Sequence, residues 1–149
     1  RGRYLQDAEV AELIVGMLAQ AGITVNLEFM EWSSFVELRN ANENKDAYLL
    51  GLGNSMYDGA YSLDRFHTDR FEGHTDYSNP DVDALLNQSR VNMNSESREA
   101  QLQEVQKIVA EDTPYITLYL EKINTGVNDS INFTPTSDEM LYVPTITRK

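Results

Sequence analysis

The stretch Ile23-Thr24-Val25-Asn26-Leu27-Glu28-Phe29 decides the fold class, because its apolar and polar residues alternate as in a half-buried β-strand. The residues before it, 7–22, carry apolar side chains at helical spacing. A predicted short helix over residues 33–39 follows it, and then a nearly continuous apolar run over residues 48–52 that is typical of a buried strand. Helix, strand, helix and strand in this order predict an α/β layer with parallel strand pairing.

Residues with known cap preferences set the ends of the predicted helices. Asp7 is the predicted N-cap of the first helix, and Gly22 is its predicted stop. Asn79 is expected to cap a helix that begins at Pro80, and Ser95 to cap a long helix. Two further elements are predicted: a helix over residues 61–68 and a strand over residues 116–120. The long helix that follows Ser95 is predicted over residues 96–111.

Composition excludes several classes of function. The chain has 149 residues and a formal net charge of −12, and its basic residues are scattered, so a nucleic-acid partner is not expected. It has no cysteine, which excludes disulfides, thiol catalysis and the common structural zinc sites. No apolar run reaches the roughly 18 residues of a membrane-spanning helix. The chain starts at Arg1 without a Met, so we expect it to be part of a longer protein.

The last part of the chain differs in composition from the rest. From Glu121 onward it is rich in Asn, Thr, Ser and Asp, with only short apolar islands. Such a segment has too few apolar residues for a core of its own. We therefore expect this segment either to pack on something else or to be partly disordered.

Motifs for catalysis are incomplete in this sequence. There is no GxSxG nucleophile elbow and no recognisable Ser, His and Asp triad. His67 and His74, with Asp69 and Glu72 between them, leave open a metal-dependent hydrolase, although their spacing matches no helical zinc motif. We expect a protein that is not an enzyme, with no catalytic residue, no metal and no cofactor.

A ligand site is predicted directly after the buried strand over residues 48–52. In open α/β sheets, ligands bind in the crevice beyond the carboxyl ends of the strands. The residues there offer adaptable apolar surface and hydrogen-bonding groups, and the single tryptophan follows the other predicted strand. An ordinary polar turn explains the same composition equally well. The predicted ligand-binding residues are Trp32, Asn54, Ser55, Met56, Tyr57, Asp58 and Tyr61.

Several stretches of the chain together resemble one known family. The most specific is Tyr77-Ser78-Asn79-Pro80-Asp81-Val82-Asp83-Ala84-Leu85-Leu86. The others, in collinear order, are Gly2-Arg3-Tyr4, Glu9-Val10-Ala11, Gly16-Met17-Leu18, Ala21-Gly22-Ile23-Thr24-Val25, Met30-Glu31-Trp32, Arg98, Gln106-Lys107-Ile108, Glu111-Asp112-Thr113-Pro114-Tyr115-Ile116, Thr134-Pro135 and Asp138-Glu139. They resemble the C-terminal lobe of the bacterial extracellular solute-binding proteins of family 5, which serve peptide and nickel ABC importers.

This resemblance implies a two-lobed, type II-like periplasmic binding protein in which helices pack on a small, mostly parallel sheet. Residues 1–122 would form its C-terminal ligand-binding lobe, and residues 123–149 would be a return segment that packs on the missing N-terminal lobe. Its partners would be a small-molecule or peptide ligand, an ABC permease in the membrane and an N-terminal lobe that this chain lacks. The two lobes would close on the ligand by a hinge motion. The location would be extracytoplasmic, either periplasmic or as a cell-surface lipoprotein. The alternatives are the metal-dependent hydrolase above and a sensor that uses the same lobe.

The resemblance also bears on the ligand. Peptide-binding members of the family place an aspartate after the strand to pair with the amino terminus of the peptide. The alignment puts Ser55 at that position, and Asp58 follows three residues later. A neutral hydroxyl cannot make the charge-assisted hydrogen bond that a carboxylate makes. A sugar or another small polar solute is therefore an expected ligand beside a peptide.

Overall fold

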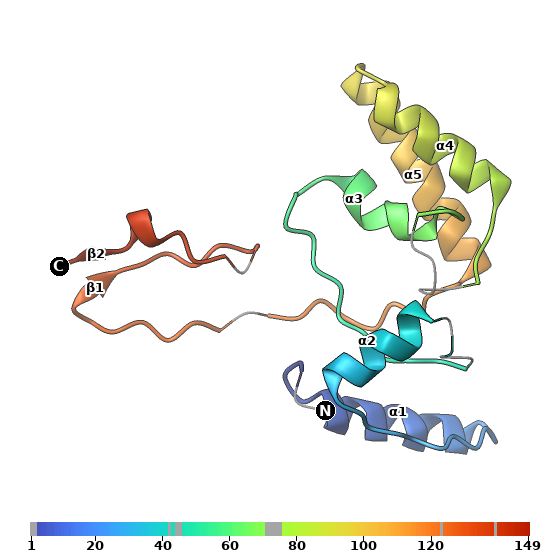
Figure 1. The fold of residues 1–149 in the computed structure, drawn as a ribbon, viewed down its shortest axis with the longest axis horizontal. Helices are drawn as coiled ribbons and strands as arrows, with labels where there is room; N and C mark the ends of the chain where they lie inside the picture. The colour runs from blue at the N-terminus through green and yellow to red at the C-terminus, as the bar shows by residue number, and fades with distance from the viewer. Residues whose placement is uncertain (1–2, 42, 44–45, 71–75, 123, 139) are drawn as a thin grey trace. The chain divides into compact units, whose positions relative to one another are not determined.

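The computed structural model describes residues 3–41, 43, 46–70, 76–122, 124–138 and 140–149 (Figure 1). These residues divide into two compact units, which we describe separately. The first comprises the described residues within Arg1–Leu52 and Phe71–Asp76, and the second comprises those within Gly53–Arg70 and Tyr77–Lys149. Helices make up most of the regular structure in both.

The first unit contains helices α1 (Asp7–Gln20) and α2 (Trp32–Asn40). Gly22 ends α1 as predicted: it has a φ of +81°, and its N–H donates to the carbonyl of Ala19 at 3.0 Å. The N–H of Ile23 donates to the carbonyl of Leu18 at 2.9 Å, which completes a Schellman motif. A left-handed conformation suits glycine here because it has no Cβ.

The predicted N-cap of α1 is shifted by one residue. Asp7 is the first helical residue, and Gln6 is the N-cap with a φ of +57° and no side-chain cap hydrogen bond. The carboxylate of Asp7 instead accepts from the N–H groups of Arg3 at 2.9 Å and Tyr4 at 3.3 Å. The prediction placed the acidic side chain correctly at the helix start, where it suits the helix dipole, but assigned it the wrong backbone position.

The second unit contains α3 (Gly59–Leu63), the 3-10 helix η1 (Asp64–Phe66), α4 (Pro80–Val91) and α5 (Ser95–Asp112). Figure 1 shows α4 and α5 side by side, with α3 packed against them. Their facing side chains form the hydrophobic core. The buried members of this core are Ala60, Leu63, Phe66, Val82, Leu86, Leu102, Val105 and Val109.

Asparagines cap both long helices of the second unit. The Oδ1 of Asn79 accepts from the N–H of Asp81 at 3.0 Å, and Pro80 is the first helical residue, as predicted. The cap of α5 is Asn94, whose Oδ1 accepts from the N–H of Ser97 at 2.9 Å. The prediction of Ser95 as the cap is wrong, because the backbone of Ser95 is already helical and only Asn94 is extended.

The described residues are rich in helix and carry a small sheet, but the parallel pairing expected of that sheet is not found among them. The only ladder in the described part of the chain joins β1 (Ile131–Asn132) to β2 (Thr147–Arg148), and it is antiparallel. The segments 23–29, 48–52 and 116–120 form neither helix nor ladder. Alternation predicts which side chains share a face, but a strand also needs a neighbour that supplies N–H and C=O groups.

These segments leave apolar side chains open to solvent. Ile23, Phe29 and Leu52 are 51%, 40% and 46% exposed, and Leu120 is 94% exposed. By contrast, Val82 and Leu86 of the helical core are fully buried. Among the described residues of the first unit only Ala8 is buried, so the main core of the described chain lies in the second unit.

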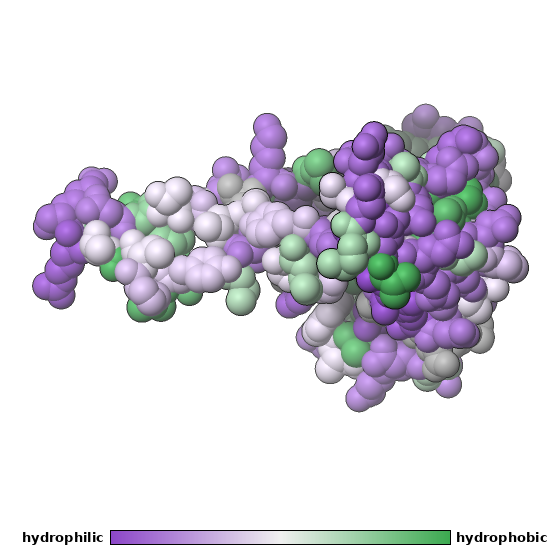
Figure 2. Space-filling view, turned by 90° about the horizontal axis from the view of Figure 1, so that it is seen from above, coloured by the Kyte–Doolittle hydropathy of each residue, from purple (hydrophilic) through white to green (hydrophobic). Residues whose placement is uncertain are grey.

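The return segment begins after Lys122 and holds β1, β2 and the 3-10 helix η2 (Val143–Thr145). None of its described residues is buried. Figure 2 shows a face of the molecule on which hydrophilic residues predominate, in keeping with the net charge of −12. No helix in the described ranges has the length and apolar character that crossing a membrane requires.

Candidate ligand-binding site

Residues 54–58 form a short turn at the start of the second unit, which we call the ligand turn because five of the predicted ligand-binding residues lie in it. Its ends are joined by the Asn54 side chain, whose Nδ2 donates to the carbonyl of Asp58 at 3.0 Å. Inside the turn Tyr57 has a φ of +52°, which is uncommon for a residue with a Cβ. Such backbone strain persists only where neighbouring contacts fix it, and it is frequent at binding sites.

Tyr57 also contacts the return segment. Its hydroxyl lies 2.9 Å from the Oγ of Ser137, and either oxygen can donate. Tyr57 is 62% exposed and Met56 is 67% exposed, so both present apolar surface to solvent. The ligand turn therefore combines a fixed backbone with accessible side chains.

Asp58 ends the ligand turn and begins α3. Its Oδ1 accepts from the N–H of Ala60 at 2.8 Å, which makes Asp58 the N-cap of α3. The Nη2 of Arg98 lies 2.9 Å from both carboxylate oxygens. The hydrogen bond from Arg98, and after it the one from Ala60, lowers the pKa of Asp58 below its ordinary value.

Arg98 connects the ligand turn to both long helices. It lies on α5, and its Nε donates to the carbonyl of Ser89 on α4 at 3.1 Å. Ser89 is fully buried, and its Oγ donates to the carbonyl of Leu86 at 2.9 Å. Sequence reasoning did not place Arg98 beside Asp58, because the two residues lie 40 positions apart.

The remaining predicted residues of this stretch are exposed. Ser55 lies in the ligand turn, and Tyr61, in the short helix α3, is 43% exposed. The structure thus brings Asn54 to Asp58 into one hydrogen-bonded turn, and it places Tyr61 in the helix that Asp58 caps.

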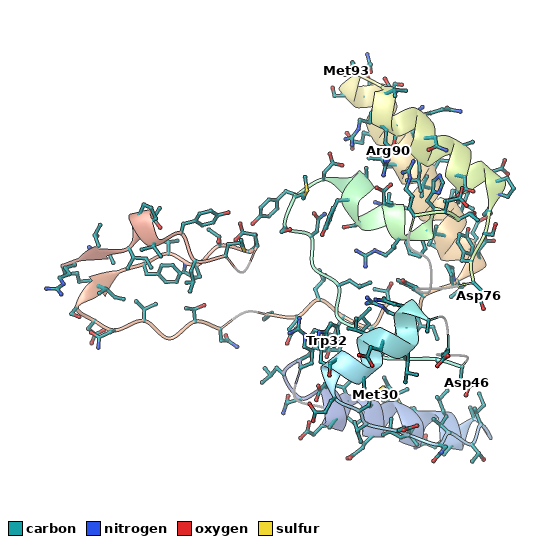
Figure 3. All side chains as sticks on the ribbon, viewed as in Figure 1. Met30, Trp32, Asp46, Asp76, Arg90 and Met93 are labelled. Atoms are coloured by element: carbon teal, nitrogen blue, oxygen red, sulfur yellow. The ribbon has the colours of Figure 1, made fainter. Side chains whose placement is uncertain are left out.

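Trp32 belongs to the first unit and is the first residue of α2 (Figure 3). Its ring stacks on Phe35 with centroids 5.5 Å apart, and the guanidinium carbon of Arg3 lies 4.5 Å from the ring centroid. These contacts account for the position of the Trp32 ring without a ligand. Its part in a common site with the ligand turn stays a prediction.

The metal-site alternative receives no support from the described residues. His67 is buried, and its Nδ1 accepts from the N–H of Asp69 at 3.1 Å and lies 3.7 Å from the carboxylate of Asp83. His74 and Glu72 lie outside the described residues. Within the described part, no three His, Cys, Asp or Glu side chains come together as a metal site.

The most specific stretch of the family resemblance, residues 77–86, joins α4 to α5. The hydroxyl of Tyr77 donates to Oδ2 of Asp112 at 2.6 Å, and Nδ2 of Asn79 donates to the same oxygen at 3.0 Å. The rings of Tyr77 and Tyr115 both pack edge-on against Phe66. This stretch therefore fixes the start of α4 to the end of α5 and does not itself form the predicted site.

Two shallow depressions on the described surface are open to solvent. One has a volume of about 570 Å³ and is lined by residues of α1, among them Leu13 and Met17. The other has a volume of about 330 Å³ and lies on the return segment beside Phe133. Neither is lined by a predicted ligand-binding residue, so neither is the predicted site.

Comparison with known proteins shows which family part of the chain is similar to. Residues 2–73 match the family model described as "Bacterial extracellular solute-binding proteins, family 5 Middle". This range contains every predicted ligand-binding residue. These residues are therefore similar to the family 5 solute-binding proteins, as the collinear motifs of the sequence predict.

A curated relative agrees with this similarity. The chain is 27% identical over 115 residues to the "Oligopeptide-binding protein AppA" of Bacillus subtilis (strain 168). The similarity covers 74% of this chain and 21% of that protein. The chain therefore spans about a fifth of the length of this relative.

Proposed function

We propose that this chain contributes one wall of the ligand site of an extracytoplasmic solute-binding protein that serves an ABC importer. The observation that carries the proposal is the family match over residues 2–73, which includes Trp32 and the whole ligand turn. The fixed geometry of the ligand turn supports it, because a binding site gains affinity when its backbone is held in place before the ligand arrives.

The protein is proposed to have two lobes, of which residues 1–122 form the C-terminal one. Residues 123–149 would return to the N-terminal lobe. The relative supports this view, since only 21% of its length is matched. The exposed apolar side chains of residues 23–29 and 116–120 support it as well, because such segments are ordinarily covered.

The ligand is proposed to be a peptide or another small polar solute that is captured and delivered to the permease without chemical change. The name of the curated relative favours a peptide. The absence of a carboxylate at Ser55 favours a solute without an amino terminus. Hinge closure of two lobes would bury the ligand between the ligand turn and the opposite lobe.

Calorimetric titration of the longer protein that contains this chain, with a mixed tripeptide pool and a mixed oligosaccharide pool, tests the proposal. We expect saturable binding of one pool and a loss of at least tenfold in affinity for Tyr61→Ala. Tyr119→Ala is the matched control, since Tyr119 is also exposed (56%) but lies outside the predicted site. Binding of neither pool, or stoichiometric metal in the purified protein, would contradict the proposal.

A further inference from the structure

Among the predicted ligand-binding residues, Asp58 is the only one with a charged side chain at neutral pH. A site that anchors an ammonium group, such as the amino terminus of a peptide, needs a carboxylate with free acceptor positions. Whether Asp58 can serve in this way depends on what its two oxygens already bind.

Both oxygens of Asp58 are already bound by groups of the protein. Oδ1 accepts from the N–H of Ala60 at 2.8 Å and lies 2.9 Å from Nη2 of Arg98. Oδ2 lies 2.9 Å from the same Nη2. The ion pair has no net charge, so the ligand turn offers little attraction to a cation.

Arg98 is also held in this position by a second contact. Its Nε donates to the carbonyl of the buried Ser89 at 3.1 Å, while its Nη2 faces Asp58. The side chain of Arg98 is 30% exposed, less than the 41% of Asp58. Moving the guanidinium aside for an incoming ammonium group would break both contacts and leave the Ser89 carbonyl without this donor.

The other groups of the ligand turn are neutral. Oδ1 of Asn54 is buried and has no hydrogen-bond partner among the described residues, so it is an acceptor that a donor could still satisfy. Ser55 supplies an exposed hydroxyl. Hydroxyl and amide groups match neutral donors and acceptors of a ligand.

We propose that the ligand turn recognises an uncharged hydrogen-bonding group and not an ammonium group, because Arg98 neutralises Asp58. The inference rests on the solute-binding function proposed above and specifies the ligand class of that site. Two sources supply such a group: the hydroxyls of a neutral saccharide and the backbone amides of a peptide whose amino terminus is not anchored here.

Calorimetric titration of the longer protein with three probes tests the inference: trialanine, N-acetyl-trialanine and the neutral trisaccharide maltotriose. We expect the two peptides to bind within fivefold of each other, or the trisaccharide to bind while neither peptide does. The first result assigns the recognised group to a peptide backbone, and the second assigns it to a saccharide. A preference of more than fivefold for the free amino terminus overturns the inference and leaves the proposed function intact. Failure of all three probes and of both mixed pools overturns the proposed function, and the inference with it.

Arg98→Gln tests the role of the arginine directly, because it leaves the Asp58 carboxylate without its ion pair. We expect this variant to gain at least fivefold in preference for trialanine over N-acetyl-trialanine relative to the unmodified protein. Arg90→Gln is the matched control: Arg90 (Figure 3) lies on α4 and pairs with Asp64, in the second unit but outside the ligand turn, so the preference should not change. An unchanged preference in Arg98→Gln overturns the inference. If Arg98→Gln does not fold, the comparison of the three probes with the unmodified protein still decides it.

Discussion

Tyr77 donates its hydroxyl to Asp112 across 35 positions of sequence, and this contact fixes the start of α4 to the end of α5. Burial, and after it the hydrogen bond to Asp112, raises the pKa of Tyr77 to about 12. The same hydrogen bond lowers the pKa of Asp112. At the scale of the residue, the most recognisable stretch of the sequence is therefore explained by packing and hydrogen bonding.

Tyr77→Phe removes the hydroxyl and keeps the ring against Phe66. We expect the free energy of unfolding to fall by about 1 kcal/mol, the usual net value of one hydrogen bond. Urea unfolding at pH 7 measures the change. Tyr119→Phe is the control, since Tyr119 is 56% exposed, and it should change the stability by less than about 0.5 kcal/mol. Equal effects of the two variants would show that the Tyr77 hydroxyl contributes nothing.

The same variant carries a pH signature. The pKa of Tyr77 is about 12 in the folded chain against a reference of 10.0, so the unfolded chain loses this proton first as the pH rises. The stabilisation from Tyr77 is complete below pH 10 and is lost between pH 10 and about 12. Urea unfolding of the unmodified chain and of Tyr77→Phe should therefore show a constant difference up to about pH 9.5 that shrinks above it. A difference that grows in this range would contradict the assignment.

At the scale of the element, the helices are explained by local sequence. Apolar periodicity predicts α1, α4 and α5, since a helix makes its backbone hydrogen bonds within itself. Cap residues predict the start of α4 and the end of α1, and they miss the start of α5 by one position. At that end Asn94 and Ser95 are both good cap residues, and only the backbone conformation distinguishes them.

Alanine variants at the start of α5 test this assignment. Asn94→Ala removes the hydrogen bond to the N–H of Ser97 and should cost about 1 kcal/mol of unfolding free energy. Ser95→Ala changes a residue inside the first turn and should cost less than about 0.5 kcal/mol. Thermal or urea unfolding of the two variants measures the difference. The reverse order of effects would restore Ser95 as the cap.

The strands and the site show why the rest could not be predicted from sequence. Alternation over residues 23–29 indicates an extended segment, but the identity of its neighbour depends on pairing with a distant part of the chain. The position of the ligand turn after residues 48–52 could be predicted for the same local reason that the helices could. Its ion pair with Arg98 could not, because opposite charges 40 positions apart have many possible partners.

At the scale of the whole chain, stability is concentrated in the second unit, where α3, α4 and α5 share one core. Leu86→Ala should lower the free energy of unfolding by about 2–5 kcal/mol, because Leu86 is fully buried and the change leaves a cavity. Leu120→Ala is the matched control at a residue that is 94% exposed, and a change within about 0.5 kcal/mol is expected. Urea unfolding measures both, and similar losses would place the core elsewhere.

Hydrogen exchange tests the distribution of stability along the chain. The amides of α4 and α5 should exchange slowly, since they are hydrogen-bonded and surround the core. The amides of residues 23–29, 48–52 and 116–120 should exchange quickly in the isolated chain, because these segments form no ladder. Mass spectrometry of the exchanged chain after proteolysis measures both. Strong protection over residues 124–149 would contradict the assignment of the return segment.

The exposed alternating segment over residues 23–29 has a consequence for handling this protein. It carries one charge, Glu28, and neither proline nor glycine, which is the composition of segments that stack into intermolecular β-sheets. An exposed extended segment of this kind is a template for aggregation. We expect the isolated chain to form light-scattering, β-rich aggregates at high concentration. Thr24→Lys, which adds a gatekeeper charge, should delay their formation, and an unchanged delay time would exclude this segment as the nucleus.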